Sequence, residues 1–285
     1  FTNPAAVVEN IQRITGHIAA KLTAEAAATA PDANAALEAA SPPDAETKSA
    51  AHPSQQIGTA VPVSRQALTL IPAKDGRFFY IDPAGEYWRT YLFIEDAVTY
   101  ERMESSALAR KAGTAIGAFQ RLLSDYSGPS LHETIPNFHN MHSRYAQLDQ
   151  AAARNAAGRL AEVREELAFL EANRARGMIL SDGLANGTLP RSITHNDTKL
   201  NNILFDAATD NTLCIIDLDT VMPGIRLFDT GDLIRTSANT ASEDETDLTK
   251  VRFDIDIFAA LIEGYLSASS GFLTAAEKSL IAESG

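Results

Sequence analysis

Two short polar segments separated by a hairpin pattern place the strongest constraint on how this chain folds. Residues 195–202 read His-Asn-Asp-Thr-Lys-Leu-Asn-Asn, and residues 217–219 read Asp-Leu-Asp. The stretch 203–216 between them begins and ends with apolar residues and carries Asp, Ala, Thr and Asn in its middle. This pattern predicts two buried strands joined by a turn. Such a hairpin would bring Asp217 back beside the first polar segment.

The spacing within these segments is typical of a phosphoryl-transfer site, where few side chains must hold magnesium and orient a hydroxyl. Asp197 follows His195 by two residues and precedes Asn202 by five. In a loop of this form the Asp accepts the proton of the substrate hydroxyl, and the Asn reaches a magnesium ion. Asp217 then takes the place of the carboxylate that binds magnesium in protein kinases, and Asp219 is a candidate second carboxylate.

Lys199, two residues after Asp197, is expected to neutralise charge on the transferred phosphate. Taken singly, an Asp, Asn or His in a loop more often caps or turns the backbone. The joint pattern, with a hairpin between the two segments, favours the catalytic interpretation. His132, His139 and His142 match no standard zinc signature, so we do not expect them to bind a metal.

The composition allows an enzyme and excludes some partners. With 285 residues, of which 45% are hydrophobic, the chain can bury a substantial core. Its 24 basic and 37 acidic residues give a net charge of −13, which argues against nucleic acid and anionic membranes as partners. The single cysteine, Cys214, falls in a predicted strand and is expected to be a core residue. Because no apolar run approaches the roughly twenty residues that span a bilayer, and the chain begins with no signal sequence, we expect a cytoplasmic setting.

Several segments resemble the aminoglycoside phosphotransferase and choline kinase superfamily, and most closely its N-acetylhexosamine 1-kinases. The resemblance is carried by residues 194–202, 216–224, 229–235, 87–95, 133–139, 242–245 and 247–248. Members of that group phosphorylate the anomeric hydroxyl of N-acetylglucosamine or N-acetylgalactosamine with ATP and magnesium. The resemblance implies an α+β, protein-kinase-like fold with a small β-rich N-lobe, incomplete here, and a larger, mostly helical C-lobe. It also implies an amino sugar as the small-molecule partner.

The resemblance assigns roles to residues outside the two polar segments. The strand end at 93–95 would be the hinge between the lobes, where backbone groups bind adenine. The residues implied are Phe93, Ile94 and Glu95 for adenine, and His139, Arg235 and Thr236, together with Asp197, for the sugar. Relatives carry an aromatic residue near the position of Thr236, so the hexosamine preference is less well defined than the reaction. Asp229 and Asp232 are implied to brace the catalytic loop.

We expect an N-lobe over residues 1–95 and a helical C-lobe over 96–285 that carries the catalytic loop and the metal-binding hairpin. In the N-lobe, an amphipathic helix begins at Pro4, the first helical position. A low-complexity insertion rich in Ala, Pro, Ser and Thr follows over 23–62. Strand and turn patterns over 68–94 predict a three-stranded meander.

Some single residues carry further expectations. Glu9 stands where a kinase-like fold could pair a carboxylate with a basic strand residue, and Trp88 is expected in the core. Gly113 and Gly117 lie four apart on a helical stripe and would permit close helix approach. In the C-lobe, helices are predicted over 144–175 and 254–266, and a capping box at Thr274 opens another.

The resemblance also implies segments that this sequence lacks. Members of the family begin with a glycine-containing strand pair that covers the ATP phosphates, and they continue past the equivalent of Gly285 with helices that close the sugar pocket. We therefore expect the chain to be a fragment of a longer protein.

Other functions remain open at this point. Another acceptor of the superfamily, such as an aminoglycoside, choline, ethanolamine or a different sugar, would use the same catalytic residues. A choline site would need an aromatic cage, which the residues after Asp219 do not suggest. A non-catalytic binding protein with a kinase-like fold would be expected to have lost Asp197, Asn202 or Asp217, and all three are present.

Overall fold

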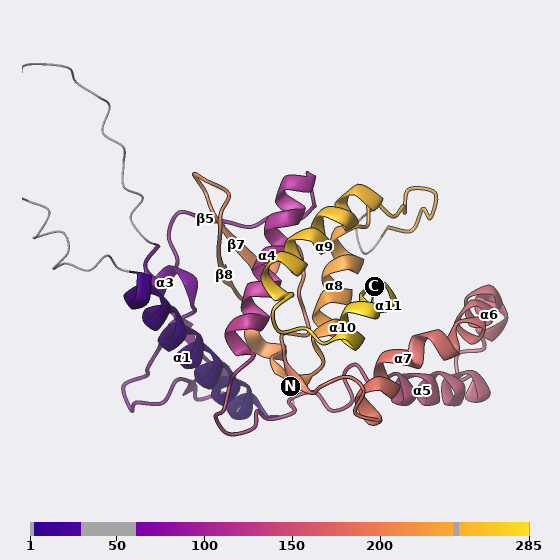
Figure 1. Cartoon of the computed structure of the whole chain (residues 1–285). Coiled ribbons are helices and arrows are strands. Elements are labelled where there is room, and N and C mark those ends of the chain that lie inside the picture. The colour runs from indigo at the N-terminus through magenta and orange to yellow at the C-terminus, as the bar shows by residue number, and fades with distance from the viewer. Residues whose placement is uncertain (1–2, 30–60, 242–244, 285) are drawn as a thin grey trace, which may run out of the picture.

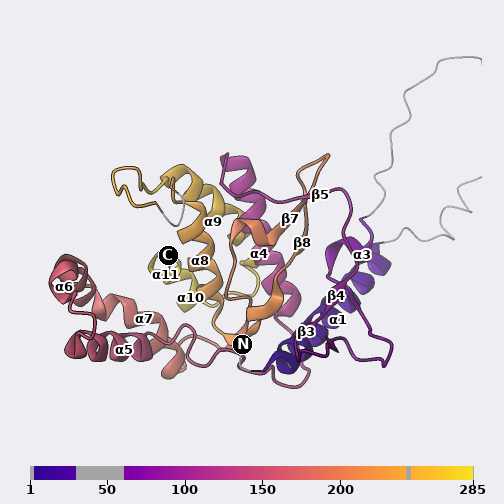
Figure 2. The same cartoon turned by 180° about the vertical axis from the view of Figure 1, so that it is seen from behind.

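The computed structural model describes residues 3–29, 61–241 and 245–284 (Figure 1). A long N-terminal helix lies on one flank together with short strands, and a group of helices with a small sheet forms the centre. Helices between residues 141 and 185 project as an arm on the opposite flank. The view from behind shows the same order (Figure 2).

Helix α1 spans Pro4–Thr29 and begins where the sequence predicts. Asn3 caps it, because the backbone N–H of Ala6 donates to Asn3 Oδ1 at 3.2 Å. The predicted apolar face is buried, and its buried members include Val7, Val8, Ile11, Ile14 and Ile18. The periodic spacing of these residues therefore positioned the helix correctly.

The helix continues past residue 23, where the low-complexity insertion was predicted to begin. Residues 24–29 are mostly Ala, the best helix former, so low complexity here is compatible with helix. The rest of the predicted insertion, residues 30–60, lies outside the described residues. So do residues 242–244 of the segment 242–245.

Residues 68–94 form a two-stranded hairpin and not the predicted three-stranded meander. Strand β1 (Leu70–Ile71) pairs with β4 (Thr90–Tyr91), and β2 (Tyr80–Ile81) pairs with β3 (Tyr87–Trp88), both antiparallel. The third predicted strand thus pairs with both of the others. The turn at 73–77, closed by a 2.7 Å backbone hydrogen bond, is an excursion within one arm and does not add a strand.

The prediction that Trp88 belongs to the core is wrong. Its side chain is 61% exposed, and its indole N–H donates to Asp82 at 2.9 Å on the same hairpin. A two-stranded hairpin buries fewer side chains than a meander packed as a sheet, so an aromatic residue in it is left in solvent.

The predicted hairpin between the polar segments is confirmed. Strand β7 (Ile203–Asp206) pairs antiparallel with β8 (Thr212–Ile215), and β5 (Ala97–Val98) adds to β7 to give the order β5-β7-β8. Strand β6 (Ser192–Thr194) pairs with β9 (Met222–Gly224). The first polar segment lies between β6 and β7 and the second between β8 and β9, so both pairings bring the two segments together.

Helices α4 (Ser106–Leu123) and α9 (Ile255–Ser269) pack at close range in the central core. A Cβ built on Gly113 would lie 2.1 Å from the carbonyl oxygen of Leu261 in α9. A Cβ on Gly117 would lie 2.8 Å from another backbone oxygen of the same helix. The predicted close approach at these glycines is confirmed, and any side chain at Gly113 would force the helices apart.

Helix α8 (Arg226–Ser237) lies beside α4 and α9, and α10 (Ala275–Ser279) and α11 (Ile281–Ser284) end the described chain. The capping box at Thr274 is confirmed, since its hydroxyl accepts the N–H of Glu277 at 3.1 Å. Among the described helices, none has both the length and the apolar content to cross a bilayer.

The prediction of one helix over 144–175 is wrong, because the arm contains several. Helix α5 (Met141–Arg154) ends at Asn155, whose φ of 41° is the left-handed conformation that terminates helices. A short 3-10 turn leads to α6 (Arg164–Ala172), and α7 (Arg174–Ala185) returns along α5.

Candidate active site

The loop of the first polar segment is held by a buried carboxylate on α8. Asp229 accepts the backbone N–H of His195 at 3.1 Å and that of Asn196 at 2.8 Å, and Gln120 of α4 donates to it at 3.2 Å. Burial raises the pKa of Asp229, while His195 and these hydrogen bonds act in the opposite direction. The bracing role that the resemblance implied for Asp229 agrees with these contacts.

Asn196 turns the loop and links it to the second polar segment. Its φ of 67° is a left-handed conformation that Asn tolerates better than most residues. Its Nδ2 donates to the carbonyl of Thr220 at 2.8 Å, and its Oδ1 accepts from the hydroxyl of Thr194 at 2.9 Å. The hydroxyl of Thr220 donates in turn to the carbonyl of His195 at 2.6 Å. These contacts hold the loop and the 3-10 turn Leu218–Thr220 together.

His195 is a buried support for the loop. Its Nε2 lies 2.9 Å from the carbonyl of Ile216, which makes Nε2 the donor. Its Nδ1 then accepts the backbone N–H of Asp197 at 3.2 Å. The ring is edge-on to Phe119, with centroids 5.8 Å apart. His195 therefore sets the backbone at Asp197 and has no path to a substrate.

Asp197, Lys199 and Asn202 lie together at the end of this loop. The Nδ2 of Asn202 donates to the carbonyl of Asp197 at 2.8 Å and to its carboxylate at 3.2 Å. The ammonium of Lys199 lies 3.3 Å from the other carboxylate oxygen of Asp197. Because the amide nitrogen of Asn202 points to Asp197, its Oδ1 is the end of the amide that suits a hard cation.

Asp217 is brought to the same place from the end of β8. The N–H of Ile216 donates to the carbonyl of Asn202 at 2.9 Å, and Asp217 adopts a left-handed φ of 57°. Burial raises the pKa of Asp217, and the neighbouring carboxylates of Asp219 and Asp197 raise it further. The structure thus brings the predicted Asp197 and Asp217 close enough for their negative charges to repel each other. A cation would relieve that repulsion, and oxygen donors from Asn202 and Asp217 fit magnesium.

Asp219 lies in the same turn but has a different partner. Arg89, between β3 and β4 of the hairpin, donates from Nη2 to Asp219 Oδ1 in an ion pair. The metal-binding role proposed for Asp219 stays a prediction, and this contact engages one of its two oxygens. Sequence reasoning missed Arg89, although it is the one charged residue within 87–94.

The predicted adenine contacts form the link from β4 to β5. Phe93 is 82% exposed, whereas Ile94 is buried. The carbonyl of Glu95 accepts from the guanidinium of Arg65 at 3.0 Å. Arg65 also pairs with Asp206 at the end of β7 at 3.1 Å, so it ties this link to the central sheet. Adenine binding by Phe93, Ile94 and Glu95 stays a prediction.

The predicted sugar residues divide between two pockets. His139 lines a pocket of about 290 Å³ with Asn196, Arg191 and Phe228. Its ring lies 4.7 Å from that of Phe228, and burial lowers the pKa of His139 against the opposing effects of Asp232 and the Asn196 backbone.

Thr236 lines another pocket, of about 510 Å³, together with Lys199. The other lining residues are Glu101, Arg102, Met103, Leu200, Asn201, Asn239, Thr240 and Ala241. Arg235 pairs with Asp232 at 2.9 Å. Thr236 therefore shares a pocket with Lys199, whose ammonium lies 3.3 Å from the carboxylate of Asp197.

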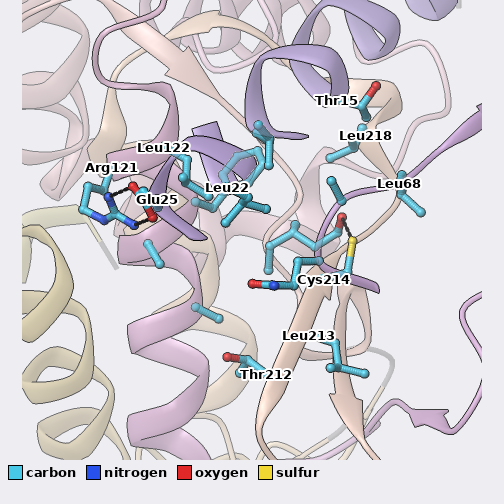
Figure 3. Close-up of a pocket in the computed structure, with 17 residues that line it drawn as sticks. Thr15, Leu22, Glu25, Leu68, Arg121, Leu122, Thr212, Leu213, Cys214 and Leu218 are labelled. Atoms are coloured by element: carbon cyan, nitrogen blue, oxygen red, sulfur yellow. Dashed lines mark hydrogen bonds and ion pairs between the residues drawn. The ribbon is translucent and has the colours of Figure 1, made fainter. Parts of the chain in front are cut away.

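A further pocket lies between α1, α4 and β8, and no predicted site residue lines it (Figure 3). Arg121 and Glu25 form an ion pair at 2.7 Å on its edge. Cys214 points toward the backbone and donates from Sγ to the carbonyl of Ile215 at 3.3 Å. Burial raises the pKa of Cys214 to about 12. The prediction that Cys214 is a core residue and not a nucleophile is consistent with this burial.

His132, His139 and His142 have separate partners. His132 bonds Glu9 at 2.7 Å, His142 bonds Asp182 at 2.7 Å, and His139 packs against Phe138 and Phe228. Within residues 3–29, 61–241 and 245–284, no three His, Cys, Asp or Glu side chains are grouped to hold a metal. The predicted magnesium set, two carboxylates and an amide, is of another type.

Comparison with known proteins identifies the family to which this chain belongs. Residues 62–268 match the pattern described as "Phosphotransferase enzyme family". Among solved structures, an aminoglycoside phosphotransferase from Alicyclobacillus acidocaldarius is similar with a TM-score of 0.50 and 14% identity, over 76% of this chain and 63% of that one. This similarity confirms the predicted α+β, kinase-like fold class.

A microcompartment-associated aminopropanol kinase is similar with a TM-score of 0.49 and 18% identity, over 76% of this chain and 63% of that one. A choline/ethanolamine kinase family protein from Mesorhizobium loti has a TM-score of 0.42 and 16% identity, over 78% of this chain and 60% of that one. The chain spans less than two thirds of the length of each of these structures.

Proposed function

Because this chain belongs to the phosphotransferase enzyme family, we propose that it is a small-molecule kinase. In this proposal the donor is ATP, the divalent ion is Mg²⁺, and the acceptor is a hydroxyl group. The setting is the cytoplasm, where ATP is supplied. The residues in catalysis are Asp197 and Lys199.

The observation that carries the proposal is the meeting of Asp197, Asn202 and Asp217. The hydrogen bonds from Asn202 to Asp197 and from Ile216 to Asn202 hold the three residues at one place from two segments. In this proposal Asp197 orients the acceptor hydroxyl and takes its proton as the phosphoryl group leaves ATP. Lys199, beside it, balances charge on the phosphoryl oxygens.

Asn202 and Asp217 would hold the magnesium ion. When bound, the ion neutralises charge on the phosphate oxygens of the nucleotide. Burial, and after it the neighbouring carboxylates of Asp219 and Asp197, raise the pKa of Asp217, and this cluster of carboxylates supports a cation at this position. The link at 93–95 would contact adenine.

We propose a neutral, polyhydroxylated acceptor in the pocket that Lys199 and Thr236 share. Its lining combines two cations, Arg102 and Lys199, with one carboxylate, Glu101, and otherwise has amides, hydroxyls and apolar groups. Amides and hydroxyls bind sugar hydroxyls by hydrogen bonds. The resemblance narrows the acceptor further, to the anomeric hydroxyl of an N-acetylhexosamine.

This lining also argues against a cationic acceptor. An aminoglycoside would need clustered carboxylates, and choline would need aromatic faces around its ammonium. The pocket contributes one carboxylate and no aromatic ring from its described lining residues. A neutral sugar therefore fits the pocket better than an amino alcohol or an aminoglycoside.

The test is a panel of hexosamines, hexoses, choline, ethanolamine and aminoglycosides, assayed for ATP consumption with the full-length protein. Phosphorus NMR of the product would locate the new phosphate. We expect turnover with N-acetylhexosamines and a phosphate at the anomeric carbon. Turnover only with choline or aminoglycosides would contradict the proposed acceptor.

Asp197→Asn is the matched test of the mechanism. Because the amide cannot accept the proton, we expect turnover to fall by about 10²- to 10⁴-fold. Nucleotide binding, measured by calorimetry, should remain close to that of the wild type. Retained turnover in this variant would overturn the assignment of Asp197.

A further inference from the structure

Arg89 reaches from the hairpin to the turn that carries Asp217. It lies between β3 and β4 on the strand shared by both pairings of the hairpin. Its guanidinium contacts Asp219, 130 residues later in the chain. The side chains of Arg89 and Asp219 are 28% and 19% exposed, so the ion pair is mostly withdrawn from solvent. A mostly buried ion pair is favourable only if the attraction between its two charges, held in good geometry, outweighs the cost of removing them from water.

The same strand presents a second residue to this turn. Tyr91 lies beneath the guanidinium of Arg89, which is 5.7 Å from the centre of its ring. Burial raises the pKa of Tyr91, the charge of Arg89 lowers it, and the carboxylates of Asp219 and Asp217 raise it. The hairpin therefore faces both acids of the turn with a cation and a phenol.

The turn is held on its other side by the catalytic loop. Thr220 exchanges hydrogen bonds with His195 and Asn196, and Ile216 donates to Asn202. Asp217 sits between these anchors in a left-handed conformation that a residue with a Cβ adopts at a cost. Within the turn, Asp219 is the residue whose side chain forms an ion pair with the hairpin.

The carboxylate that the resemblance suggested for linking helix and strand has other partners. Glu9 of α1 forms an ion pair with Arg13 and lies 2.7 Å from His132. Neither Arg13 nor His132 belongs to the hairpin, so these two bonds of Glu9 do not link α1 to it. In the described part of the chain, the ion pair that joins the hairpin to the Asp217 turn is Arg89 with Asp219.

We propose that Arg89 is a positioning residue that holds Asp219, and through it Asp217, in the geometry that receives the metal–nucleotide complex. This inference rests on the proposed kinase function. In this role Asp219 is the partner of Arg89 and is not a ligand of the metal. Arg89 also couples the position of the hairpin to that of the metal-binding turn.

The physical reason is charge as well as position. Without Arg89, Asp219 would be a half-buried carboxylate with no partner, next to Asp217 and Asp197. It would repel the nucleotide phosphates and compete with Asp217 for the metal. The loss should therefore appear in binding of the metal–nucleotide complex as well as in turnover.

The experiment is a double-mutant cycle on the full-length protein with Arg89→Met, Asp219→Asn and the combined variant. We expect kcat/KM for ATP to fall about 30-fold in Arg89→Met and about 5-fold in Asp219→Asn. The combined variant should be no worse than Arg89→Met, because removing the carboxylate removes the uncompensated charge. Arg89→Lys should recover part of the loss, since it keeps the charge but not the fork geometry.

The control is Arg77→Met. Arg77 pairs with Asp75 on the same hairpin. That ion pair is half-exposed and includes no residue of the Asp217 turn. We expect kcat/KM within about 2-fold of the wild type, as for most surface ion pairs.

A second readout needs neither ATP nor metal. Hydrogen exchange of the backbone amides at 216–221 should become several-fold faster in Arg89→Met and stay unchanged in Arg77→Met. Unchanged exchange at 216–221, or losses that multiply in the combined variant, would overturn the proposal. So would a loss in Asp219→Asn far larger than in Arg89→Met, because Asp219 would then act as a metal ligand. Absence of ATP turnover in the wild type would refute the proposed function. The hydrogen-exchange measurement would still test whether Arg89 positions the turn.

Discussion

The catalytic loop and the N-terminal hairpin differ in how they are held. The loop over 194–202 is mostly withdrawn from solvent, the buried carboxylate of Asp229 accepts two of its backbone N–H groups, and the side chains of Thr194 and Asn196 bond to each other. The hairpin over 70–91 has strands of two residues each and leaves Tyr80, Tyr87 and Trp88 exposed. It contacts the turn beside the loop through the ion pair of Arg89 with Asp219, and its Leu70 and Tyr91 belong to the same hydrophobic cluster as Leu218.

This difference indicates that the catalytic loop is the rigid part of the site and that the hairpin is the part that can move. A loop held by many buried hydrogen bonds keeps Asp197 and Asn202 in place whatever the rest of the chain does. A hairpin with short strands and exposed side chains shifts more easily, and in our proposal the ion pair of Arg89 with Asp219 carries such a shift to Asp217. Substitutions that remove the support of the loop should therefore change stability, whereas Arg89→Met in the hairpin should change function.

The largest effect on stability is expected for Asp229→Ala, which breaks the support of the loop. The substitution leaves the backbone N–H groups of His195 and Asn196 buried without an acceptor. We expect the free energy of unfolding to fall by about 3 kcal/mol, measured in urea. Asp75→Ala in the exposed hairpin turn is the control, with an expected change below about 0.5 kcal/mol. Equal effects in the two variants would mean that the loop is no better held than the hairpin.

A somewhat smaller effect is expected for Gly113→Ala in the helix pair beneath the loop. The new Cβ would lie 2.1 Å from a backbone oxygen of α9, so a helix must move. We expect about 2 kcal/mol of destabilisation, seen as a lower thermal midpoint. Gly16→Ala in α1 is the matched control, because no atom lies within 4 Å of its new Cβ. That variant should gain about 0.5 to 1 kcal/mol from helix propensity, and destabilisation there would contradict the packing described.

The smallest effect concerns pH and His139, which lies against the loop at Asn196. Burial lowers the pKa of His139 in the folded state, so the unfolded chain binds the proton more readily. Stability should therefore decrease as the pH falls below the unfolded value of about 6.5, and it should be recovered as the pH rises through that value. His139→Gln should flatten this part of the stability profile between pH 5 and pH 8. An unchanged slope would show that His139 does not titrate with unfolding.

Local patterns predicted the elements whose stabilising contacts are near in sequence. The start and apolar face of α1, the hairpin β7–β8 and the capping box at Thr274 were all predicted correctly. The predictions failed where a local pattern allowed more than one outcome. After the turn at 73–77, β2 runs in the same direction as β1 and does not pair with it. Asn155 ends a helix that periodicity alone would continue.

The candidate site shows the same division. The spacing of Asp197 and Asn202 and the hairpin before Asp217 were sufficient to predict that these residues meet, because a hairpin returns the chain to its starting point. The partner of Asp219 could not be predicted in this way. Arg89 and Asp219 are 130 residues apart, and Asp229 lies 33 residues from Asn196.

The sequence by itself therefore determined which chemical groups are present, their order, and the meeting of the two polar segments. Only the tertiary structure decided which charges compensate one another, which predicted sugar residue shares a pocket with Lys199, and what supports the loop. Periodicity and spacing describe contacts within a helix or a hairpin. Ion pairs and buried hydrogen bonds between distant segments depend on how those elements pack, and no local pattern records that.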